Sequence, residues 1–346
     1  MKYAHYLIFL IGASLLLSCN NDGDNLSTGT LDPDSVISAW LDSMNITATR
    51  DASGIYYYPV TENPSGSAVS QAGQVLAFYY ALLDLDSNAI ASFQPADGDS
   101  LLYKFASNAV FPLGLDVGFG LMRTGETYNF VVPPSQGYAD APSITTADGT
   151  GIVLLQTSLV GLFSEDQINT TELSQIDDYI RVHNLNDTIS VTIERIDTTF
   201  IGNTILSIDT TFNYVIDSVE YFNSGVRYKE LVAGMGNGPL NGDTVIIDYS
   251  LEYLDGTAIT SSSNFTYVIG SGIPDFLIPG LEFGLSLMPP GERALIMIPS
   301  AQAYRESARI VPASIIPELI DAAIIPDYVA DVEPYRPLVF NVIRTQ

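Results

Sequence analysis

An internal repeat constrains this chain more than any other feature of its sequence. Residues 114–122 (GLDVGFGLM) match residues 280–288 (GLEFGLSLM), and a tyrosine follows each segment, at Tyr138 and Tyr304. All of these matched positions are 166 residues apart. Chance similarity rarely keeps one spacing over so many positions, so a single structural unit occurs twice.

A second block of the repeat lies upstream of the first. Tyr80 and Tyr249 belong to this block and are 169 residues apart. A length difference of three residues between the two blocks explains the change of spacing. We refer to residues of about 54–161 as the first copy and to residues of about 225–346 as the second copy.

A short helix is predicted ahead of each copy. Ile37, Trp40, Leu41 and Met44 have the spacing of one apolar helix face. The corresponding segment before the second copy begins near Ile176 and is followed by about 32 residues that the first copy lacks. A helix therefore leads into each copy, and the second copy carries an insertion.

The insertion has the composition of two β-strands. Residues 196–200 and 208–212 both read IDTTF, and threonine alternates with isoleucine around them. The pair Gly202-Asn203 between them is typical of a tight turn. We therefore expect a β-hairpin within residues 190–221.

Within a copy, the pattern indicates an antiparallel sheet and one short helix. Residues 244–254 form a long apolar strand, and Asp255-Gly256 after it is a hairpin signal because both positions tolerate positive φ. Leu281, Leu285 and Met288 follow with helical spacing, and Gly284 between them suits a close approach to a sheet. These elements predict an α+β fold, in which an antiparallel half-barrel sheet wraps around one short helix.

The N-terminus has the pattern of an export leader. Lys2 precedes an apolar run over residues 6–17, which is too short to span a membrane in the ordinary way. Residues 16–19 (LLSC), which end at the only cysteine, Cys19, resemble the lipobox of bacterial lipoproteins. That resemblance implies cleavage before Cys19, attachment of a diacylglycerol to its thiol, and a stable membrane anchor because two acyl chains are attached.

These signals divide the chain into five predicted segments. They are a signal peptide at 1–18, an acidic tether at 19–34, the first domain with its leading helix at 35–165, a linker helix with the β-hairpin at 170–222, and the second domain at 223–346.

Composition excludes several classes of function. The chain has 13 basic and 40 acidic residues and a net charge of −27, which opposes binding to nucleic acid. One cysteine excludes an intrachain disulfide and a thiolate metal cluster. With His5 in the leader, His183 is left alone at a predicted helix C-terminus, which excludes a multi-histidine metal site. No metal or cofactor is expected, and carboxylate chemistry or function by shape and apolar contact remains open.

Several short motifs of the second copy resemble the FKBP-type peptidyl-prolyl cis-trans isomerases. They are GDTV at 242–245, YVIG at 267–270, IPGL at 278–281, GER at 291–293 and FNV at 340–342. The first copy resembles the family mainly through its similarity to the second. The resemblance implies two FKBP-like domains and an apolar groove that isomerises X–Pro bonds without a nucleophile, a metal or a titrating base.

The resemblance also implies which residues form the groove. In the second copy the catalytic positions are Tyr249, Phe265, Ile278, Leu281, Tyr304 and Phe340, with Ile259 and Leu277 as further substrate contacts. In the family, the backbone N–H at the position of Ile278 and the hydroxyl at the position of Tyr304 hold the carbonyl groups of the peptide. The matching positions of the first copy are Tyr80, Ile90, Phe111, Leu115 and Tyr138.

The sequence departs from the family at three points. Leu281 and Leu115 stand where the family has a tryptophan, and Thr260 stands where it usually has an aspartate. Pro112 occupies the first-copy position whose N–H would bind the peptide, and proline has no N–H. We therefore expect the first site to be inactive and the second to retain slow activity.

Three functions remain open at this point. The first is a prolyl isomerase that helps exported, proline-containing polypeptides to fold; the second is a chaperone that binds peptides without catalysis; the third is a structural envelope subunit that pairs through the hairpin edge. Asn20 after the cysteine favours the outer membrane, facing the periplasm, over the inner membrane, and surface exposure stays open. Residues 305–337, which are longer than the usual family loop, are expected to gate the groove or to enlarge its rim.

Overall fold

The structure is a computed structural model that describes residues 32–346, except for 70, 108, 186–187, 202–203, 218, 272–277, 306 and 326–331. For residues 188–201 and 204–217 it describes the backbone alone. Pro33–Gln346 form one compact unit. The predicted leader, Cys19 and most of the predicted tether lie outside the described residues, so the expected lipidation stays a prediction.

The first copy forms a seven-stranded antiparallel sheet. Its strand order is β1-β2-β7-β8-β3-β4, and β5 also pairs with β3. The strands are β1 (Thr49–Arg50), β2 (Tyr56–Thr61), β3 (Val75–Asp84), β4 (Ala89–Phe93), β5 (Leu101–Lys104), β7 (Glu126–Val132) and β8 (Val153–Phe163). One short helix, α2 (Leu113–Phe119), follows the two-residue strand β6 (Val110–Phe111).

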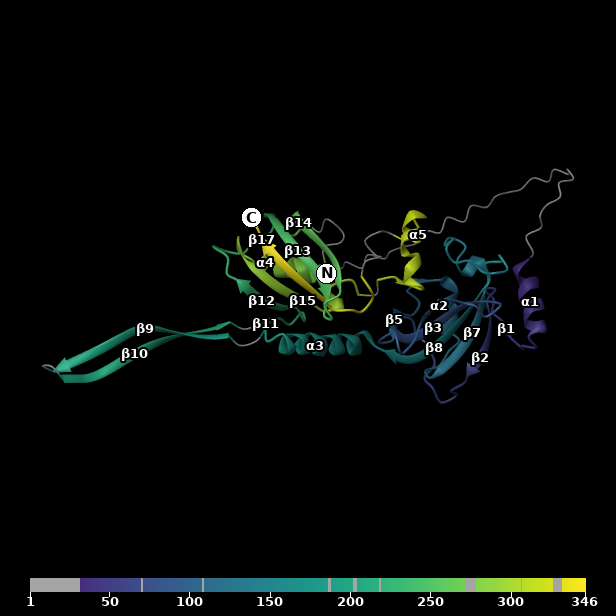
Figure 1. Cartoon of the computed structure of the whole chain (residues 1–346), viewed down its shortest axis with the longest axis horizontal. Coiled ribbons are helices and arrows are strands. Elements are labelled where there is room, and N and C mark those ends of the chain that lie inside the picture. The colour runs from purple at the N-terminus through teal and green to yellow at the C-terminus, as the bar shows by residue number, and fades with distance from the viewer. Residues whose placement is uncertain are drawn as a thin grey trace. The chain divides into compact units, whose positions relative to one another are not determined.

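The second copy forms a six-stranded antiparallel sheet with the equivalent order β11-β12-β15-β17-β13-β14 (Figure 1). The strands are β11 (Glu220–Tyr221), β12 (Arg227–Val232), β13 (Thr244–Tyr253), β14 (Ala258–Val268), β15 (Arg293–Ile298) and β17 (Leu338–Arg344). Its short helix is α4 (Pro279–Leu287). Strand β14 is continuous where the first copy has β4 and β5, and residues 94–100 between these two strands make the first copy longer at this point. The predicted α+β class with antiparallel sheets is confirmed.

A glycine in each short helix allows the helix to lie close to its sheet. A Cβ atom built on Gly284 would lie 2.4 Å from Ile296 Cδ1, and one built on Gly118 would lie 2.9 Å from the ring of Phe130. Ile296 and Phe130 are fully buried strand residues. The predicted close approach at Gly284 is therefore confirmed, and the first copy repeats it.

The leading helices pack on their sheets with equivalent residues. In α1 (Pro33–Ser43), Ile37 and Leu41 are buried against a cluster that includes Val131 of β7. In α3 (Glu165–Val182), Ile176 and Ile180 are buried with Met297 of β15, which is the equivalent of Val131. The predicted apolar face of the first helix is shorter than expected, because Met44 lies beyond the end of α1 and is 54% exposed.

Helix boundaries differ from the expected segment limits by a few residues. Helix α1 begins at Pro33, within the predicted tether. Helix α3 begins at Glu165, before the expected residue 170, because Ser164 and Gln167 form a capping box there. His183 is the C-cap of α3, as its position in the sequence predicted. The second sheet also begins slightly early, with β11 at Glu220.

The insertion forms the expected antiparallel pair. Strands β9 (Thr188–Ile201) and β10 (Thr204–Asp217) pair from Ile201↔Thr204 to Thr188↔Asp217 and appear as a long two-stranded ribbon in Figure 1. The connecting Gly202-Asn203 lies outside the described residues. At the Asp255-Gly256 turn, Gly256 alone of the two adopts a positive φ, of 84°.

The segment between Tyr304 and β17 contains further short elements. They are β16 (Arg309–Ile310), η3 (Ala313–Ile315) and α5 (Ile316–Asp321), after η2 (Ser300–Gln302); the first copy has η1 (Pro134–Gln136) at the position of η2. Strand β16 pairs in parallel with β6 of the first copy. This pairing was not expected, because the loop was predicted to border the groove of its own copy.

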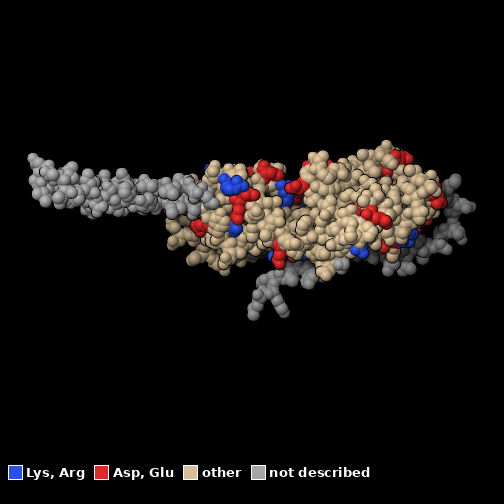
Figure 2. All heavy atoms as spheres, turned by 90° about the horizontal axis from the view of Figure 1, so that it is seen from below, with Lys and Arg blue, Asp and Glu red and all other residues tan. Residues whose placement is uncertain are grey.

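Figure 2 shows one face, on which acidic and basic groups are scattered among uncharged side chains and several basic groups lie beside acidic ones. No helix within the described part of the chain is long and apolar enough to cross a membrane.

Candidate functional site: two equivalent grooves

Three aromatic side chains of the second copy converge from adjacent strands. Tyr249 on β13 lies between Phe265 on β14 and Phe340 on β17, and both ring-centroid distances are 5.9 Å. The Tyr249 and Phe265 rings meet edge to face, at 89°. Such pairs favour a fixed arrangement of the rings. The antiparallel register places Tyr249 opposite Val342 and Leu251 opposite Phe340, so Tyr249 and Phe340 lie diagonally across the strand pair.

The start of α4 belongs to the same apolar cluster as these aromatic side chains. Ile278 is the N-cap of α4 and Leu281 lies in its first turn, and each is only 4% exposed. The carbonyl of Ile278 accepts hydrogen bonds from the N–H groups of Leu281 and Glu282, both at 3.1 Å. The N–H of an N-cap residue lies outside the helical hydrogen-bond ladder, so this geometry suits a donor to a bound carbonyl.

The remaining predicted residues of the second copy form a partly exposed rim. Tyr249, Ile259, Phe265 and Tyr304 are all partly buried and pack against the core of this copy. Burial raises the pKa of Tyr249 above its ordinary value. Leu277 lies outside the described residues. The structure thus brings all the other predicted residues of this groove together around Phe340, Leu281 and Ile278, and leaves their rim accessible.

The equivalent side chains of the first copy are more deeply buried. Tyr80 and Tyr138 are 6% and 5% exposed, and Leu115 is fully buried. Phe111 and Ile90 are partly buried against the same core, and Phe111 lies edge to face with Tyr138 at 5.6 Å. Burial raises the pKa of Tyr80 to about 12 and also raises the pKa of Tyr138 well above its ordinary value. The predicted first-copy residues therefore also lie together, but in a closed environment.

A segment of the second copy closes this environment. The Tyr138 hydroxyl donates a hydrogen bond to the Val311 carbonyl at 2.6 Å, and the Val311 N–H donates to the Phe111 carbonyl at 2.9 Å. Val311 is fully buried in the core cluster of the first copy, which also contains Ile315, Leu319 and Ile325. The prediction that this loop gates its own groove is not supported, because the side chains just named pack in the other copy.

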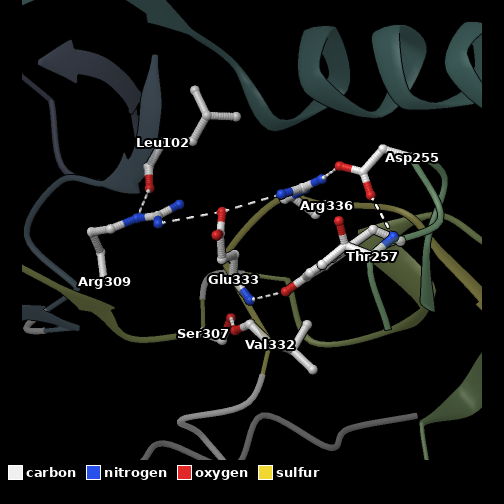
Figure 3. Close-up of polar contacts among 9 residues, drawn as sticks. Leu102, Asp255, Thr257, Ser307, Arg309, Val332, Glu333 and Arg336 are labelled. Atoms are coloured by element: carbon white, nitrogen blue, oxygen red, sulfur yellow. Dashed lines mark hydrogen bonds and ion pairs between the residues drawn. The ribbon is translucent and has the colours of Figure 1, made fainter. Parts of the chain in front are cut away.

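Polar contacts hold the two ends of this loop (Figure 3). The Arg309 guanidinium donates to the Leu102 carbonyl of β5 at 3.1 Å and lies 3.6 Å from the Glu333 carboxylate. Arg336 lies between Glu333, at 3.6 Å, and Asp255, at 2.8 Å. Burial lowers the pKa of Arg309, and the Glu333 carboxylate opposes that shift.

A cleft of about 700 Å³ lies beside these polar contacts. Its lining includes Asp97, Asp178, Asp255, Arg309 and Arg336, and it contains none of the groove residues predicted from the sequence. Four of its charged side chains, Arg309, Glu333, Arg336 and Asp255, already pair with one another. The described residues contain no group of three or more His, Cys, Asp or Glu side chains that could hold a metal ion.

Sequence analysis missed the role of Val311 and Pro312 at the first groove. Val311-Pro312 is one of five X–Pro pairs between Tyr304 and β17, and Ile316-Pro317 and Ile325-Pro326 resemble it in having a β-branched aliphatic residue before the proline. Nothing in their spacing distinguishes the pair that enters a groove. The unusual length of the loop was the one available signal.

The family comparison identifies the second copy. Residues 236–342 match the family described as FKBP-type peptidyl-prolyl cis-trans isomerase. This range contains all the second-copy groove residues predicted from the sequence.

Curated relatives match the same part of the chain. A probable FKBP-type peptidyl-prolyl cis-trans isomerase FkpA of Neisseria meningitidis is 34% identical over 94 residues, which cover 27% of this chain and 34% of the relative. The outer membrane protein MIP of Legionella longbeachae is 33% identical over 85 residues, which cover 23% of this chain and 34% of the relative. The chain thus spans about a third of the length of the curated relatives it matches.

A solved structure with several such domains is also similar. The three FKBP domains of wheat FKBP73 share 16% sequence identity, with a TM-score of 0.28, over 87% of this chain and 98% of that one. The family assignment does not depend on this similarity, since the sequence matches above carry it. This chain therefore contains an FKBP-type peptidyl-prolyl cis-trans isomerase domain over residues 236–342, and the family resemblance of the second copy is confirmed.

Proposed function

We propose that the second copy isomerises X–Pro bonds in the groove formed by Tyr249, Phe265 and Phe340. The observation that carries this proposal is the convergence of the three rings with Ile278 and Leu281, within the range that matches the isomerase family. The rim of this groove is partly exposed, so a peptide has access to it.

The groove provides what amide rotation needs. Rotation about an X–Pro bond crosses a barrier of roughly 18–20 kcal/mol, because the planar amide loses its resonance when it twists. The twisted amide is less polar than the planar one, so apolar aromatic walls favour it over the ground state. The Tyr304 hydroxyl and the Ile278 N–H would hold the flanking carbonyls while the bond turns. No proton transfer or covalent intermediate is required.

We also propose that the protein is an exported lipoprotein of the cell envelope. Cys19 would carry the acyl chains, and the polar residues after it would separate the folded unit from the membrane. Its partners would then be proline-containing exported polypeptides that fold near the membrane. One of the matched relatives is named an outer membrane protein, which agrees with this placement.

The second candidate function is binding of peptides without catalysis. It is favoured by Thr260, which is exposed where the family usually has an aspartate, and by Leu281 in place of the tryptophan. A groove without these two side chains would still bury proline but would polarise and orient the amide less well.

The third candidate, a structural envelope subunit, is favoured by the β9–β10 pair, because both strands of a two-stranded sheet have a free edge.

A protease-coupled isomerisation assay on the chain from Asn20 to Gln346 tests the first candidate, with a Leu-Pro or Phe-Pro tetrapeptide as substrate. Tyr304→Phe should lower kcat/KM by roughly tenfold, since it removes one hydrogen bond to the peptide. Phe265→Ala should lower it by at least as much, because it opens one wall of the groove.

Matched controls are available in the same chain. Tyr179→Phe alters a ring on α3 that contacts His183, and Phe222→Ala alters a ring that contacts Phe283. Both should retain wild-type activity. A folded wild-type protein without activity above background would exclude the isomerase, and peptide binding that is lost in Phe265→Ala would then support the second candidate.

A further inference from the structure

We propose that the groove of the first copy is a binding site for a segment of this same chain, in which Val311-Pro312 is the permanently bound ligand. The first copy would then serve as a clamp for the long loop of the second copy, and not as a second substrate site. This inference concerns the first groove and does not depend on isomerase activity in the second.

The contact reproduces the recognition expected of a peptide substrate. The Tyr138 hydroxyl donates to the carbonyl of the residue that precedes Pro312, at 2.6 Å. Tyr138 is the counterpart of Tyr304, the hydroxyl that we expect to hold a peptide carbonyl in the second groove. The bound segment is therefore an X–Pro dipeptide, and the Val311 carbonyl meets the tyrosine that both copies of the repeat share at this position.

Pro112 explains how the first groove differs in its polar contacts. It occupies the position of Ile278 and has no N–H to offer. The neighbouring Phe111 carbonyl instead accepts a hydrogen bond from the Val311 N–H at 2.9 Å, and the Ala109 carbonyl accepts one from the Arg309 N–H at 2.7 Å. The loop thus binds as a short parallel strand beside β6, with its polar backbone groups satisfied.

Apolar burial accounts for the permanence of this contact. Val311, Ile315 and Leu319 are fully buried, and all three belong to the core cluster of the first copy. Pro312 is buried as well, whereas Ala313 and Ser314 next to it are exposed. Side chains that are fully buried in this way contribute to a core, so the loop completes the first copy instead of covering it transiently.

Both ends of the bound segment have additional attachments to the first copy. Arg309 is 7% exposed and reaches the Leu102 carbonyl, as Figure 3 shows. At the other end, the Glu318 carboxylate accepts a hydrogen bond from the Ser143 N–H at 3.0 Å. The segment is therefore fixed before, at and after Val311-Pro312.

Two consequences follow for the molecule. The first groove cannot accept a polypeptide while Val311 occupies it. The same attachment places the buried apolar side chains of residues 309–325 in the core of the first copy, whereas Val332 of the same loop packs in the core of the second. The repeat therefore uses one groove to position the loop that follows Tyr304 and leaves the other accessible.

Hydrogen exchange of the backbone amides tests the clamp on the chain from Asn20 to Gln346. We expect the Arg309 and Val311 amides to be protected in the wild type. Val311→Asp should remove this protection, because a carboxylate cannot remain in a fully buried apolar position. Ser314→Asp introduces the same charge at an exposed position of the same loop and should leave the protection unchanged.

A milder variant keeps the test valid if Val311→Asp disturbs the whole fold. Tyr138→Phe removes the hydroxyl alone and should speed exchange of the Val311 amide by roughly tenfold. Its matched control is Tyr79→Phe, which removes a tyrosine hydrogen bond to the Gly98 carbonyl elsewhere in the first copy and should not affect the Val311 amide. Rapid exchange of Val311 in the wild type, or equal exchange in the two tyrosine variants, would refute the clamp.

Competition with a free peptide shows whether the groove recognises the segment itself. An N-acetylated, C-amidated peptide of residues 310–313 should slow exchange around residues 109–115 in Val311→Asp but not in the wild type, whose groove is filled. The effect should weaken in the double variant Val311→Asp/Tyr138→Phe. Protection of these residues by the peptide in the wild type would show an open first groove and would overturn the proposal.

Discussion

The two copies have the same strand order and the same short helix, yet their grooves have different contents. In the second copy, Tyr249, Ile259, Phe265 and Tyr304 form a partly exposed rim. In the first copy, Tyr80 and Tyr138 are almost fully buried, because Val311 and the residues after it fill the space. One backbone arrangement thus supports an accessible groove and a filled one.

The first groove is filled and the second is accessible mainly because of the length of the loop after Tyr304, and less because of the groove residues themselves. Both grooves carry a tyrosine on the long central strand, a leucine in the short helix and a tyrosine after the next strand. The segment after Tyr304 is long enough to reach the other copy, and it carries an X–Pro pair. A duplicated domain can therefore acquire a structural role for one site when the other copy supplies a ligand for it.

The largest effect should come from Leu319→Ala. Leu319 belongs to the second copy by sequence but is fully buried in the core of the first. Its truncation should cost about 2–5 kcal/mol of the stability of the first copy, measured by urea unfolding with hydrogen exchange resolved for each copy. The same substitution at Leu240, which is 74% exposed, should change stability by less than about 0.5 kcal/mol. A loss confined to the second copy would contradict the comparison.

A smaller effect is expected from an alanine in either short helix. Gly284→Ala would place a Cβ atom 2.4 Å from Ile296 Cδ1, and Gly118→Ala would place one 2.9 Å from the Phe130 ring. Each should destabilise its own copy by about 1–3 kcal/mol through overpacking. Thermal unfolding of both variants would check this expectation, and an unchanged midpoint for either one would show that the helix can move away from its sheet.

The packing of α3 should contribute a pH-dependent component to stability that the packing of α1 lacks. The buried Glu172 carboxylate of α3 accepts hydrogen bonds from the Ser300 N–H and hydroxyl, both at 2.6 Å, whereas the equivalent positions in the first copy are Pro33 and Pro134. Burial raises the pKa of Glu172 above its ordinary 4.5, although Ser300 opposes the shift.

A carboxyl with a raised pKa in the folded state stabilises the fold below about pH 4.5 and loses that contribution as the pH rises through the folded value. Glu172→Gln should therefore remove one component of the stability loss that occurs as the pH rises above about 4.5. Urea unfolding at several pH values would measure it. A variant whose pH profile is parallel to that of the wild type would show that Glu172 does not titrate differently on folding.

The smallest effect should be a gain in stability. Thr157 of β8 is fully buried, and its hydroxyl has no hydrogen-bond partner among the described residues, whereas the second copy has Val342 at the equivalent position. Thr157→Val should stabilise the first copy by about 1 kcal/mol, which chemical denaturation can resolve. Thr127→Val should have the opposite sign, because the Thr127 hydroxyl is hydrogen-bonded to Ser158 at 2.8 Å.

Local sequence patterns predicted most of the fold, because each copy of the repeat could be aligned with the other. Equal spacing from Gly114 and Gly280 to the following tyrosines implied equal elements, and the two sheets do have equivalent strand orders. The sequence also predicted that Leu281 and Leu285 share one helix face and that His183 ends a helix. Both features depend only on residues that are close in sequence. Such features are fixed by short-range geometry, so the sequence reveals them.

The contents of the first groove could not be predicted in this way. Tyr138 and Val311 are separated by 173 residues, and three X–Pro pairs in the loop have similar local sequences. Which of them enters the groove depends on the distance that the loop must cross in the folded molecule. The residues of the accessible groove were easier to name, because the family resemblance supplied their positions.

The contribution of residues 309–325 to the first copy also sets an order of events during synthesis. A ribosome produces the first copy, α3 and nearly all of the second copy before Leu319 emerges. Until then, the core of the first copy lacks part of its apolar packing and exposes the surface that Ile315 and Leu319 later cover. Exposed apolar surface attracts chaperones and favours aggregation. The first copy should therefore be completed only near the end of synthesis, shortly before β17 enters the middle of the second sheet.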